Sequence, residues 1–155
     1  MHRIETLGII VRGDQILLGE KLGNPAIGKG LLNGPGGKLE EGETILECLS
    51  REVREETGLI IRESCIVPVA VLECYVQWVR NRQVHVFLIT DFRGTPKKTS
   101  SMDPQWFLRE HIPFDRMHEA DEKWLLGILN NKRLRVYLNF EEPGKGLLNH
   151  RLVSL

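Results

Sequence analysis

The sequence predicts an α+β fold with a mixed β-sheet. Segments with the composition of strands and segments with helical spacing are interspersed without the regular strand–helix–strand alternation of a doubly wound fold. With 155 residues, 41% of them hydrophobic and 27% charged, the chain has an ordinary globular composition and enough length for a sizeable core. Because no repeat or linker divides it, residues 1–155 are expected to form one domain.

The first predicted elements are two strands at residues 7–11 and 16–18, joined by a turn at Gly13-Asp14. Residues 24–37 are rich in glycine and proline and are expected to form a loop. A long antiparallel pair is predicted at residues 66–79 and 84–90, with its turn at Asn81-Arg82-Gln83, because both stretches are rich in β-branched and aromatic residues.

Towards the end of the chain, apolar residues with helical spacing predict a helix over about residues 119–130. The segments 133–140 and 147–155 have the pattern of a closing hairpin.

The charge balance of the chain bears on the kind of partner that it can bind. Lys+Arg and Asp+Glu both number 21, so bulk charge does not favour a nucleic-acid polymer or a membrane surface, whereas a small nucleotide needs only a local site. The three cysteines form no CxxC pair, which favours a reducing, cytoplasmic location. The sequence leaves the choice between a monomer and a homodimer open.

A helix over Ile45–Thr57 has clear signals at both ends. Thr44 and Glu47 form a Thr-x-x-Glu capping box at its start, and Gly58 suits the left-handed position after its end. Its buried stripe is expected to consist of four apolar residues: Ile45, Leu46, Leu49 and Val53.

Three carboxylates on this helix predict a metal site. Glu52, Glu55 and Glu56 stand at positions i, i+3 and i+4, so they lie close together, and their repulsion would be removed by a divalent cation. Gly36-Gly37 precedes the helix and can bring a backbone carbonyl close to such an ion, because glycine has no side chain. Arg51, one turn before Glu55, can pair with that carboxylate.

The pattern Gly37-x5-Glu43-x7-Arg51-Glu52-Val53-x-Glu55-Glu56-x-Gly58-Leu59 resembles the complete signature box of the Nudix hydrolases. This resemblance implies an α/β/α sandwich around a mixed sheet and hydrolysis of a nucleoside diphosphate linked to another group, with Mg²⁺ or Mn²⁺ as cofactor.

The resemblance also implies roles for the residues of the box. The metal ligands would be Glu52, Glu55, Glu56 and a backbone carbonyl at Gly36 or Gly37. One of the three glutamates, left open here, would be the general base. Glu43 and Arg51 are expected to support the catalytic carboxylates. For Glu43 and Arg51 themselves, a structural role and a catalytic role are both open.

Outside the box, further segments such as Asn33-Gly34-Pro35-Gly36-Gly37-Lys38 and residues 84–87 are similar to the MutT-type enzymes that hydrolyse oxidised purine nucleoside triphosphates such as 8-oxo-dGTP. The resemblance implies nucleoside monophosphate and pyrophosphate as products. Position by position, it assigns base contacts to Thr6, Lys21, Asn33 and Asp121, while Lys38 can reach a phosphate.

Three positions depart from the MutT-type pattern. Ser101 stands where those enzymes carry an acidic residue that supplements the metal site, although Asp103 lies two residues further on. His118 stands where those enzymes stack a tryptophan on the base, and Ala120 replaces one of two adjacent aspartates. The prediction is therefore hydrolysis of nucleoside triphosphates as a class, with oxidised purines among the candidates.

Two alternatives remain at this point. Tyr75 falls near the tyrosine of diadenosine polyphosphate hydrolases, which favours a dinucleoside polyphosphate or nucleoside diphosphate sugar substrate. Cys74, by contrast, stands where ADP-ribose hydrolases typically carry a proline. A Nudix fold that binds nucleotides without catalysis is the other alternative, although such proteins usually lack one or more of the box carboxylates.

Overall fold

The computed structural model describes residues 2–25 and 27–155. Within these residues the strands are β1 (Arg3–Arg12), β2 (Gln15–Lys21), β3 (Leu32–Asn33), β4 (Ile60–Ile61), β5 (Ile66–Val76), β6 (Val79–Ile89), β7 (Phe92–Arg93), β8 (Met102–Leu108), β9 (Leu134–Glu142) and β10 (Lys145–Ser154). The helices are α1 (Ile45–Thr57) and α2 (Leu125–Leu129), with short 3₁₀ turns at η1 (Glu63–Cys65), η2 (Arg109–His111), η3 (Phe114–Arg116) and η4 (Asp121–Lys123).

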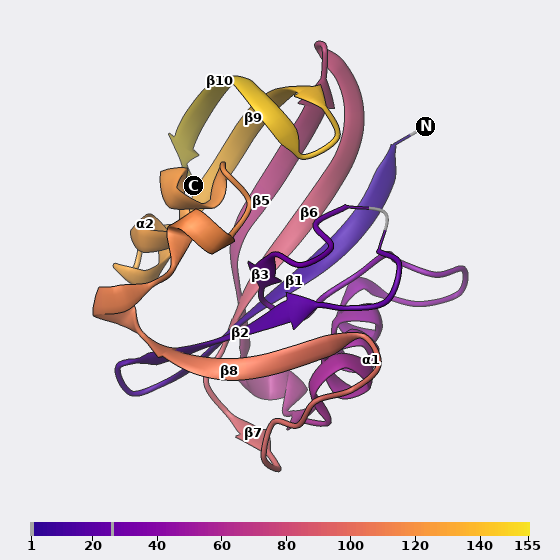
Figure 1. Ribbon diagram of the computed structural model, residues 1–155, viewed down its shortest axis with the longest axis vertical. Helices are drawn as coiled ribbons and strands as arrows, with labels where there is room; N and C mark the ends of the chain where they lie inside the picture. Colours follow the sequence, from indigo (N-terminus) through magenta and orange to yellow (C-terminus); the bar gives the residue numbers. More distant parts are fainter. Residues whose placement is uncertain (1, 26) are drawn as a thin grey trace.

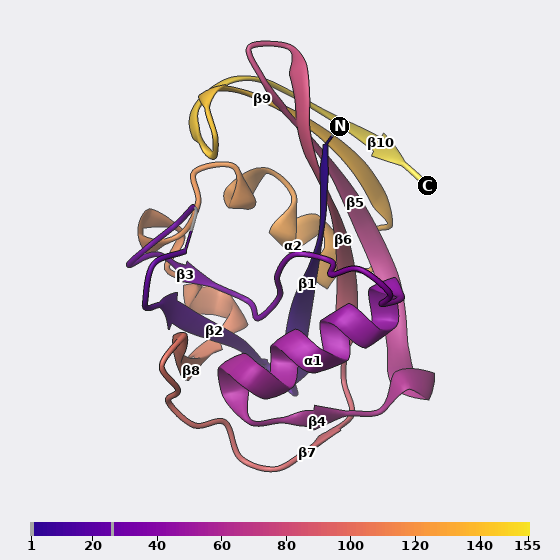
Figure 2. The ribbon, with the colours of Figure 1, turned by 90° about the vertical axis from the view of Figure 1, so that its right-hand side faces the viewer.

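In this part of the chain, eight strands form a mixed sheet in the order β10-β9-β5-β6-β1-β2-β3, with β8 also paired to β2 (Figure 1). The pairs β1–β6 and β5–β9 are parallel, and the other pairs are antiparallel. Strands β4 and β7 form a separate two-stranded ribbon beside α1 (Figure 2).

The two faces of the sheet are covered by different helices. Leu49 and Val53 of α1 are fully buried in one apolar cluster with Ile10, Phe87 and Ile89. The segment around α2 packs against the opposite face in a second cluster that includes Trp124, Leu125, Val86 and Val136. The structure therefore confirms the predicted mixed sheet in an α/β/α sandwich.

Helix α1 has the predicted bounds, whereas the strands predicted at residues 7–11 and 16–18 are the inner parts of the longer strands β1 and β2. The turn at Gly13-Asp14 joins β1 to β2, and α1 begins after Thr44 with both hydrogen bonds of the capping box. Gly58 adopts φ +80°, the left-handed conformation expected after a helix. Ile45 and Leu46 are only partly buried, so the fully buried part of the predicted stripe is Leu49 and Val53.

The turn between β5 and β6 lies four residues earlier than predicted. Gln77 and Trp78 have φ values of +49° and +65° and form a two-residue hairpin turn. The polar residues Asn81, Arg82 and Gln83, which suggested a turn, are strand residues of β6. Polar composition was misleading here because this part of β6 borders a polar cavity and a charged sheet face.

The predicted helix over residues 119–130 is also wrong in its continuity. The chain forms the 3₁₀ turn η4, leaves helical geometry at Trp124 with φ −132°, and then forms the short helix α2. Trp124 is only 1% exposed, so the break accompanies complete burial of its ring. The closing hairpin is confirmed as β9 and β10.

Residues 24–37 are not entirely irregular, because Leu32 and Asn33 form β3 against β2. Among residues 2–25 and 27–155, no helix is long and apolar enough to cross a membrane.

Candidate active site

The glycine-rich loop before α1 is held against strand β1 by backbone hydrogen bonds. The Thr6 N–H donates to the Gly37 carbonyl at 2.8 Å, and the Gly8 N–H donates to the Pro35 carbonyl at 2.7 Å. A Cβ atom at Gly36 would lie only 2.0 Å from the Thr6 carbonyl oxygen. Glycine is therefore needed at position 36 for the loop to approach the strand this closely.

Glu56, on the last turn of α1, is buried beneath this loop with 6% exposure. Its Oε1 accepts the Gly36 N–H at 2.8 Å, and its Oε2 lies 3.3 Å from the Lys21 ammonium. Burial raises the pKa of the Glu56 carboxyl, while the charge of Lys21 opposes that shift. A cation beside Glu56 thus stabilises a carboxylate that is otherwise poorly solvated.

Glu52 lies directly against the other glycine of the loop. A Cβ at Gly37 would be 2.5 Å from the Glu52 carboxylate, so any other residue would displace that side chain or the loop. Burial raises the pKa of Glu52, and the hydrogen bond from Arg51 opposes the shift. The absence of a side chain at position 37 gives Glu52 access to the loop backbone.

Arg51 organises the outer carboxylates of α1. Its Nε and Nη2 donate to Glu43 at 2.7 and 2.8 Å, and its Nη1 donates to Glu52 at 2.8 Å and to Glu55 at 3.3 Å. The paired hydrogen bonds from Arg51 lower the pKa of Glu43 to about 2, and Glu43 raises the pKa of Arg51 in turn. Arg51 therefore links the loop residue Glu43 to two of the predicted metal ligands.

The three glutamates share one side of α1, but they are not gathered into a single group. Among the described residues, no three acidic, histidine or cysteine side chains converge as metal ligands. Arg51 draws Glu52 and Glu55 to itself, while Glu56 is bonded to Gly36 and Lys21. The shared metal site of the three glutamates therefore stays a prediction, and in this structure each of the three carboxylates is held by an ion pair.

The donor set nevertheless fits a hard divalent cation, because all of its atoms are oxygens. Of the two candidate backbone ligands, the Gly37 carbonyl accepts the Thr6 N–H, whereas the Gly36 carbonyl has no hydrogen-bond donor among the described residues. A free carbonyl beside a buried carboxylate suits a metal ligand, which favours Gly36 over Gly37.

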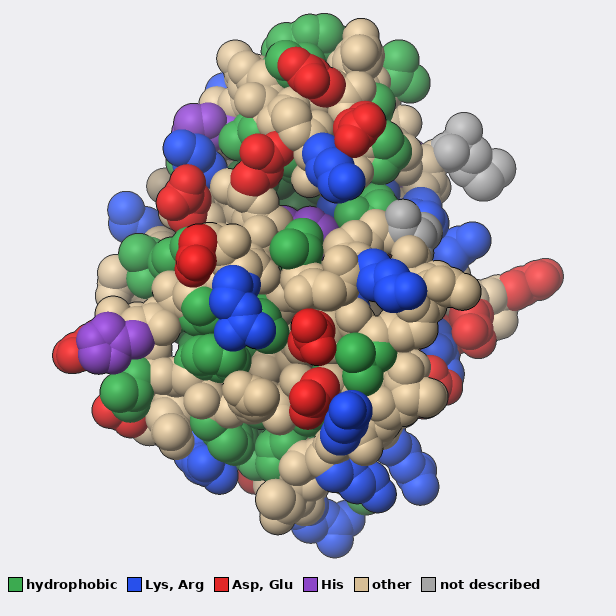
Figure 3. Space-filling model, viewed as in Figure 1, with side chains coloured by type: hydrophobic (Ala, Val, Ile, Leu, Met, Phe, Trp, Pro, Cys, Tyr) green, Lys and Arg blue, Asp and Glu red, His purple; other side chains and the backbone are tan. Residues whose placement is uncertain are grey.

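A cavity of about 500 Å³ opens beside the glycine loop. Its lining includes Gly36, Gly37 and Glu56 together with all six residues predicted to bind substrate: Thr6, Lys21, Asn33, Lys38, His118 and Asp121. The space-filling view shows this face hollowed, with a histidine side chain set back in the hollow (Figure 3). Residues from distant parts of the chain are thus brought to one place.

Several of these side chains are already engaged with the protein. The Thr6 hydroxyl lies 3.4 Å from the Gly37 carbonyl and 3.6 Å from the Cys48 sulfur, so it supports the glycine loop. The Lys21 side chain pairs with Glu56. At Lys38 the backbone carbonyl accepts a hydrogen bond from Arg51. Asn33 Oδ1 accepts the Gly34 N–H, which leaves the Asn33 amide N–H groups available to a ligand.

His118 and Asp121 lie at the end of the cavity away from α1. A Cβ at Gly28 would be 2.7 Å from His118 Nε2, so the loop after β2 packs closely on this ring. Burial lowers the pKa of His118 to about 4 and raises the pKa of Asp121 to about 7. Asp121 Oδ2 is buried without a hydrogen-bond partner among the described residues, and the protonated carboxyl that burial favours is less costly to leave unpaired than a carboxylate.

Sequence reasoning missed three charged residues of the cavity. Arg3, Glu5 and Arg82 all line it, and Glu5 accepts hydrogen bonds from both arginines. The alternation of side chains along a strand could have indicated these residues. Arg82 lies on the same face of its strand as Val84 and Val86, and Glu5 lies on the same face as Leu7. The assumed turn at residues 81–83 concealed this alternation.

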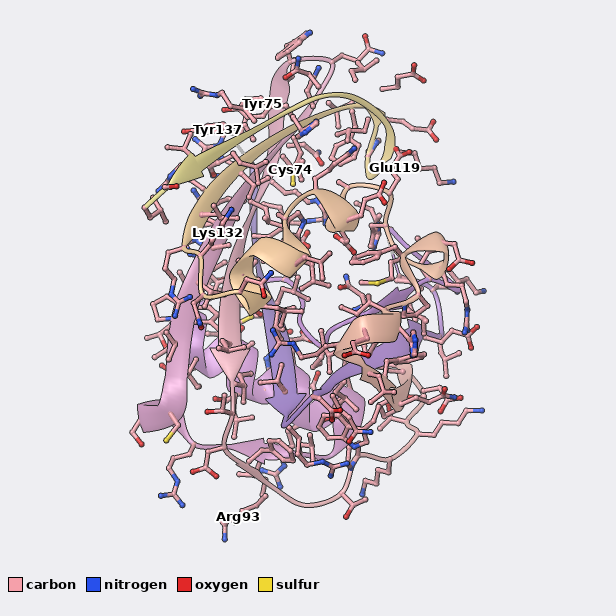
Figure 4. The ribbon with its side chains drawn as sticks, turned by 90° about the vertical axis from the view of Figure 1, so that its left-hand side faces the viewer. Cys74, Tyr75, Arg93, Glu119, Lys132 and Tyr137 are labelled. Carbon is pink, nitrogen blue, oxygen red and sulfur yellow. The ribbon has the colours of Figure 1, made fainter. Side chains whose placement is uncertain are left out.

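Tyr75, the residue behind the dinucleoside polyphosphate alternative, does not line this cavity. Cys74 does, and Tyr75 instead borders a separate groove with Trp78, Tyr137 and Arg151. Figure 4 shows Tyr75 and Tyr137 close together and apart from Cys74. The observation that favoured this alternative is therefore removed from the site.

Comparison with known proteins identifies the family. The family model of the NUDIX domain matches residues 1–127. The chain belongs to the Nudix family. It is 33% identical over 139 residues to "Oxidized purine nucleoside triphosphate hydrolase" of Danio rerio, covering 90% of this chain and 87% of the relative.

Further relatives agree with this assignment. The protein of the same description from Mus musculus is 34% identical over 140 residues, covering 90% of this chain and 88% of that protein. The crystal structure of the MutT mutator protein from Bacillus halodurans superposes with a TM-score of 0.79 at 26% identity, covering 97% of both chains. The described Nudix chain thus has the MutT architecture over nearly its whole length.

Proposed function

We propose that the chain is a nucleoside triphosphate pyrophosphohydrolase that releases nucleoside monophosphate and pyrophosphate, with oxidised purine nucleotides such as 8-oxo-dGTP among its substrates. The observation that carries this proposal is the single cavity that joins Glu56 and the glycine loop to Asn33, His118 and Asp121. One end offers oxygen ligands and the Lys21 ammonium group. The other end offers side chains that can form hydrogen bonds with a base. The two full-length relatives bear the matching description.

The residues of α1 and the glycine loop would hold the metal. We assign Glu52, Glu55, Glu56 and the Gly36 carbonyl as its ligands, with Mg²⁺ or Mn²⁺ as the ion. Bound there, the ion would neutralise phosphate charge and lower the pKa of a water molecule. Lys21 and Arg51 hold Glu56 and Glu52 in place, and they oppose the rise in pKa that burial causes in these two carboxyls.

The remaining residues bind and orient the substrate. One of the three glutamates accepts the proton of the attacking water, which requires only hydrogen-bond reach. Arg51 and Glu43 position Glu52 and Glu55 through the hydrogen bonds described above. Lys38, exposed beside the loop, contacts a phosphate, while Thr6 supports the loop, and Asn33, His118 and Asp121 contact the base.

The test is hydrolysis of a nucleotide panel by the purified protein, with products identified by mass spectrometry, with Mg²⁺, with Mn²⁺ and with a chelator. The panel contains dGTP, 8-oxo-dGTP, dATP, diadenosine tetraphosphate and a nucleoside diphosphate sugar. We expect metal-dependent conversion of triphosphates to monophosphate and pyrophosphate. Turnover confined to the dinucleotide or sugar substrates would refute the proposal, and metal-dependent binding without turnover would show a non-catalytic module.

We further propose that residues 1–155 act as one domain, as a monomer or homodimer, in the cytoplasm, without a nucleic-acid polymer or membrane as partner. All three cysteines are free thiols, which supports a reducing compartment. Light scattering of the purified chain distinguishes monomer from homodimer.

A further inference from the structure

The ion-paired group of Arg3, Glu5 and Arg82 lies inside the cavity and has no part in the proposed chemistry of α1. Glu5 Oε2 accepts Arg3 Nε at 2.6 Å, and Glu5 Oε1 accepts Arg82 Nη1 at 3.1 Å. The side chain of Glu5 is 15% exposed and that of Arg82 is 16% exposed. Two charged side chains in an enclosed position require either full pairing or a ligand.

Arg82 is only partly paired. A guanidinium carries five N–H donors, and the structure gives Arg82 one side-chain hydrogen bond among the described residues, to Glu5. Arg80, two residues earlier, differs: its Nη2 contacts both oxygens of Glu73 at 2.9 and 2.8 Å, outside the cavity. The remaining donors of Arg82 are therefore available at the cavity wall.

The sheet register places Arg82 at a distance from the glycine loop. Arg82 pairs with Arg3 across the parallel strands β1 and β6, whereas Thr6, which holds Gly37, pairs with His85. Three residues of strand separate the two positions, roughly 10 Å along the sheet at about 3.3 Å per residue. A ligand whose phosphates meet Glu56 would reach Arg82 with its other end.

The surroundings of Arg82 suit a planar base. Leu72, Val84 and Phe140 line the same cavity, as does Asp121. Burial raises the pKa of Asp121, and the positive charge of Arg82 opposes that shift. Glu5 is shared between Arg3 and Arg82, so the group keeps one positive charge, and it is the distance from Glu56 that assigns Arg82 to the base end of the ligand, where a carbonyl oxygen can accept from its free N–H groups.

We propose that Arg82, held in place by Glu5, is a specificity-determining residue that donates hydrogen bonds to the carbonyl oxygen of the base and so favours 6-oxopurine over 6-aminopurine nucleotides. A guanidinium has no acceptor, so the amino group of adenine would leave its N–H donors unpaired in an enclosed site. This inference rests on the proposed hydrolysis of nucleoside triphosphates. Glu5 is a positioning residue in it.

The experiment compares kcat/KM for dITP and dATP, which differ in the oxo or amino group at C6 and in the accompanying proton at N1. In the wild-type protein we expect dITP to be preferred by about tenfold or more. In Arg82→Met the preference should fall to within about threefold, mainly through a higher KM for dITP. Glu5→Gln should reduce the preference by a smaller factor, because Arg82 remains but is no longer held by a charge.

Arg80→Met is the matched control, since it removes the same type of side chain from the same strand outside the cavity, and it should leave the preference unchanged. Arg82→Lys is measured alongside; it keeps the charge but loses the planar fork, so an intermediate preference is expected even if Arg82→Met fails to fold. A wild-type protein that hydrolyses both nucleotides equally, or Arg82 variants that keep the full preference, would overturn the inference. Absence of any triphosphate hydrolysis would instead overturn the proposed function.

Discussion

The two ends of the cavity are built in different ways. Most groups at the end beside α1 come from one continuous stretch of chain, from the glycine loop through Glu56, and short hydrogen bonds join them, with Thr6 and Lys21 added from neighbouring strands. The other end gathers Arg82, His118 and Asp121 from separate elements. Chemistry common to many substrates can be encoded locally, whereas recognition of one substrate depends on how the whole sheet is assembled.

The largest expected effect comes from breaking the end beside α1. Glu56→Gln removes a charged metal ligand but keeps an oxygen that can accept the Gly36 N–H, so we expect kcat to fall by about a thousandfold or more. Steady-state kinetics with Mg²⁺ measure this, and far-UV circular dichroism checks that the fold is intact. Retention of more than about a tenth of the wild-type rate would exclude Glu56 as a ligand.

A smaller effect is expected from Gly37→Ala. The added Cβ would lie 2.5 Å from the Glu52 carboxylate, so that side chain or the loop must move. Displacement of a catalytic group by about 1 Å costs on the order of a hundredfold in rate, which is the loss we expect in kcat/KM. Gly127→Ala is the control, because its nearest neighbour would be the flexible Leu134 side chain at 3.3 Å, away from the cavity; equal losses in the two variants would contradict the argument.

At the other end of the cavity, His118→Trp tests whether residue 118 contacts the base. A larger aromatic surface stacks more strongly on a base, so the preference for 8-oxo-dGTP over dGTP should rise by about three- to tenfold. The ratio of kcat/KM values for the two nucleotides measures this change. His150→Trp places the same side chain on the exposed strand β10 and should leave the ratio unaltered, and no change in either variant would show that His118 does not face the base.

The smallest effect is on stability. The pKa of Asp121 rises from 3.8 to about 7 on burial, so the folded state holds a proton that the unfolded state has lost between those values. The contribution of Asp121 to the free energy of unfolding is therefore present at about pH 4 and declines until about pH 7. Asp121→Asn cannot lose this proton.

The melting temperature of Asp121→Asn relative to wild type should thus be higher at pH 8 than at pH 5, as measured by thermal denaturation. A difference between the two proteins that does not vary with pH would show that Asp121 titrates normally in the folded state.

The contrast between the two ends also explains what the sequence could predict. Thr44, Glu47 and Gly58 define α1 through local hydrogen bonds and a local backbone conformation, so its bounds follow from spacing alone. The turn at Gln77-Trp78 contains neither glycine nor asparagine, the residues that favour positive φ in hairpin turns, so its sequence did not predict it. Arg82 was consequently assigned to a turn.

Long-range pairing was the other obstacle. The break at Trp124 accompanies burial of its ring in a core built from distant strands, and Glu56 is paired with Lys21 of β2, 35 positions earlier in the chain. The residues of the signature box were found because their spacing is fixed. The ion pair of Glu5 and Arg82 was missed because 77 positions separate its members along the chain.

Strand β1 serves both ends of the cavity through neighbouring residues. The Thr6 backbone secures Gly37, while the Glu5 side chain holds Arg82. Since successive side chains of a strand point to opposite faces, a shift of β1 by a single residue against β6 would turn the Glu5 side chain to the face of α1, away from Arg82. The alignment of β1 with β6 therefore fixes the position of the glycine loop and that of Arg82 together.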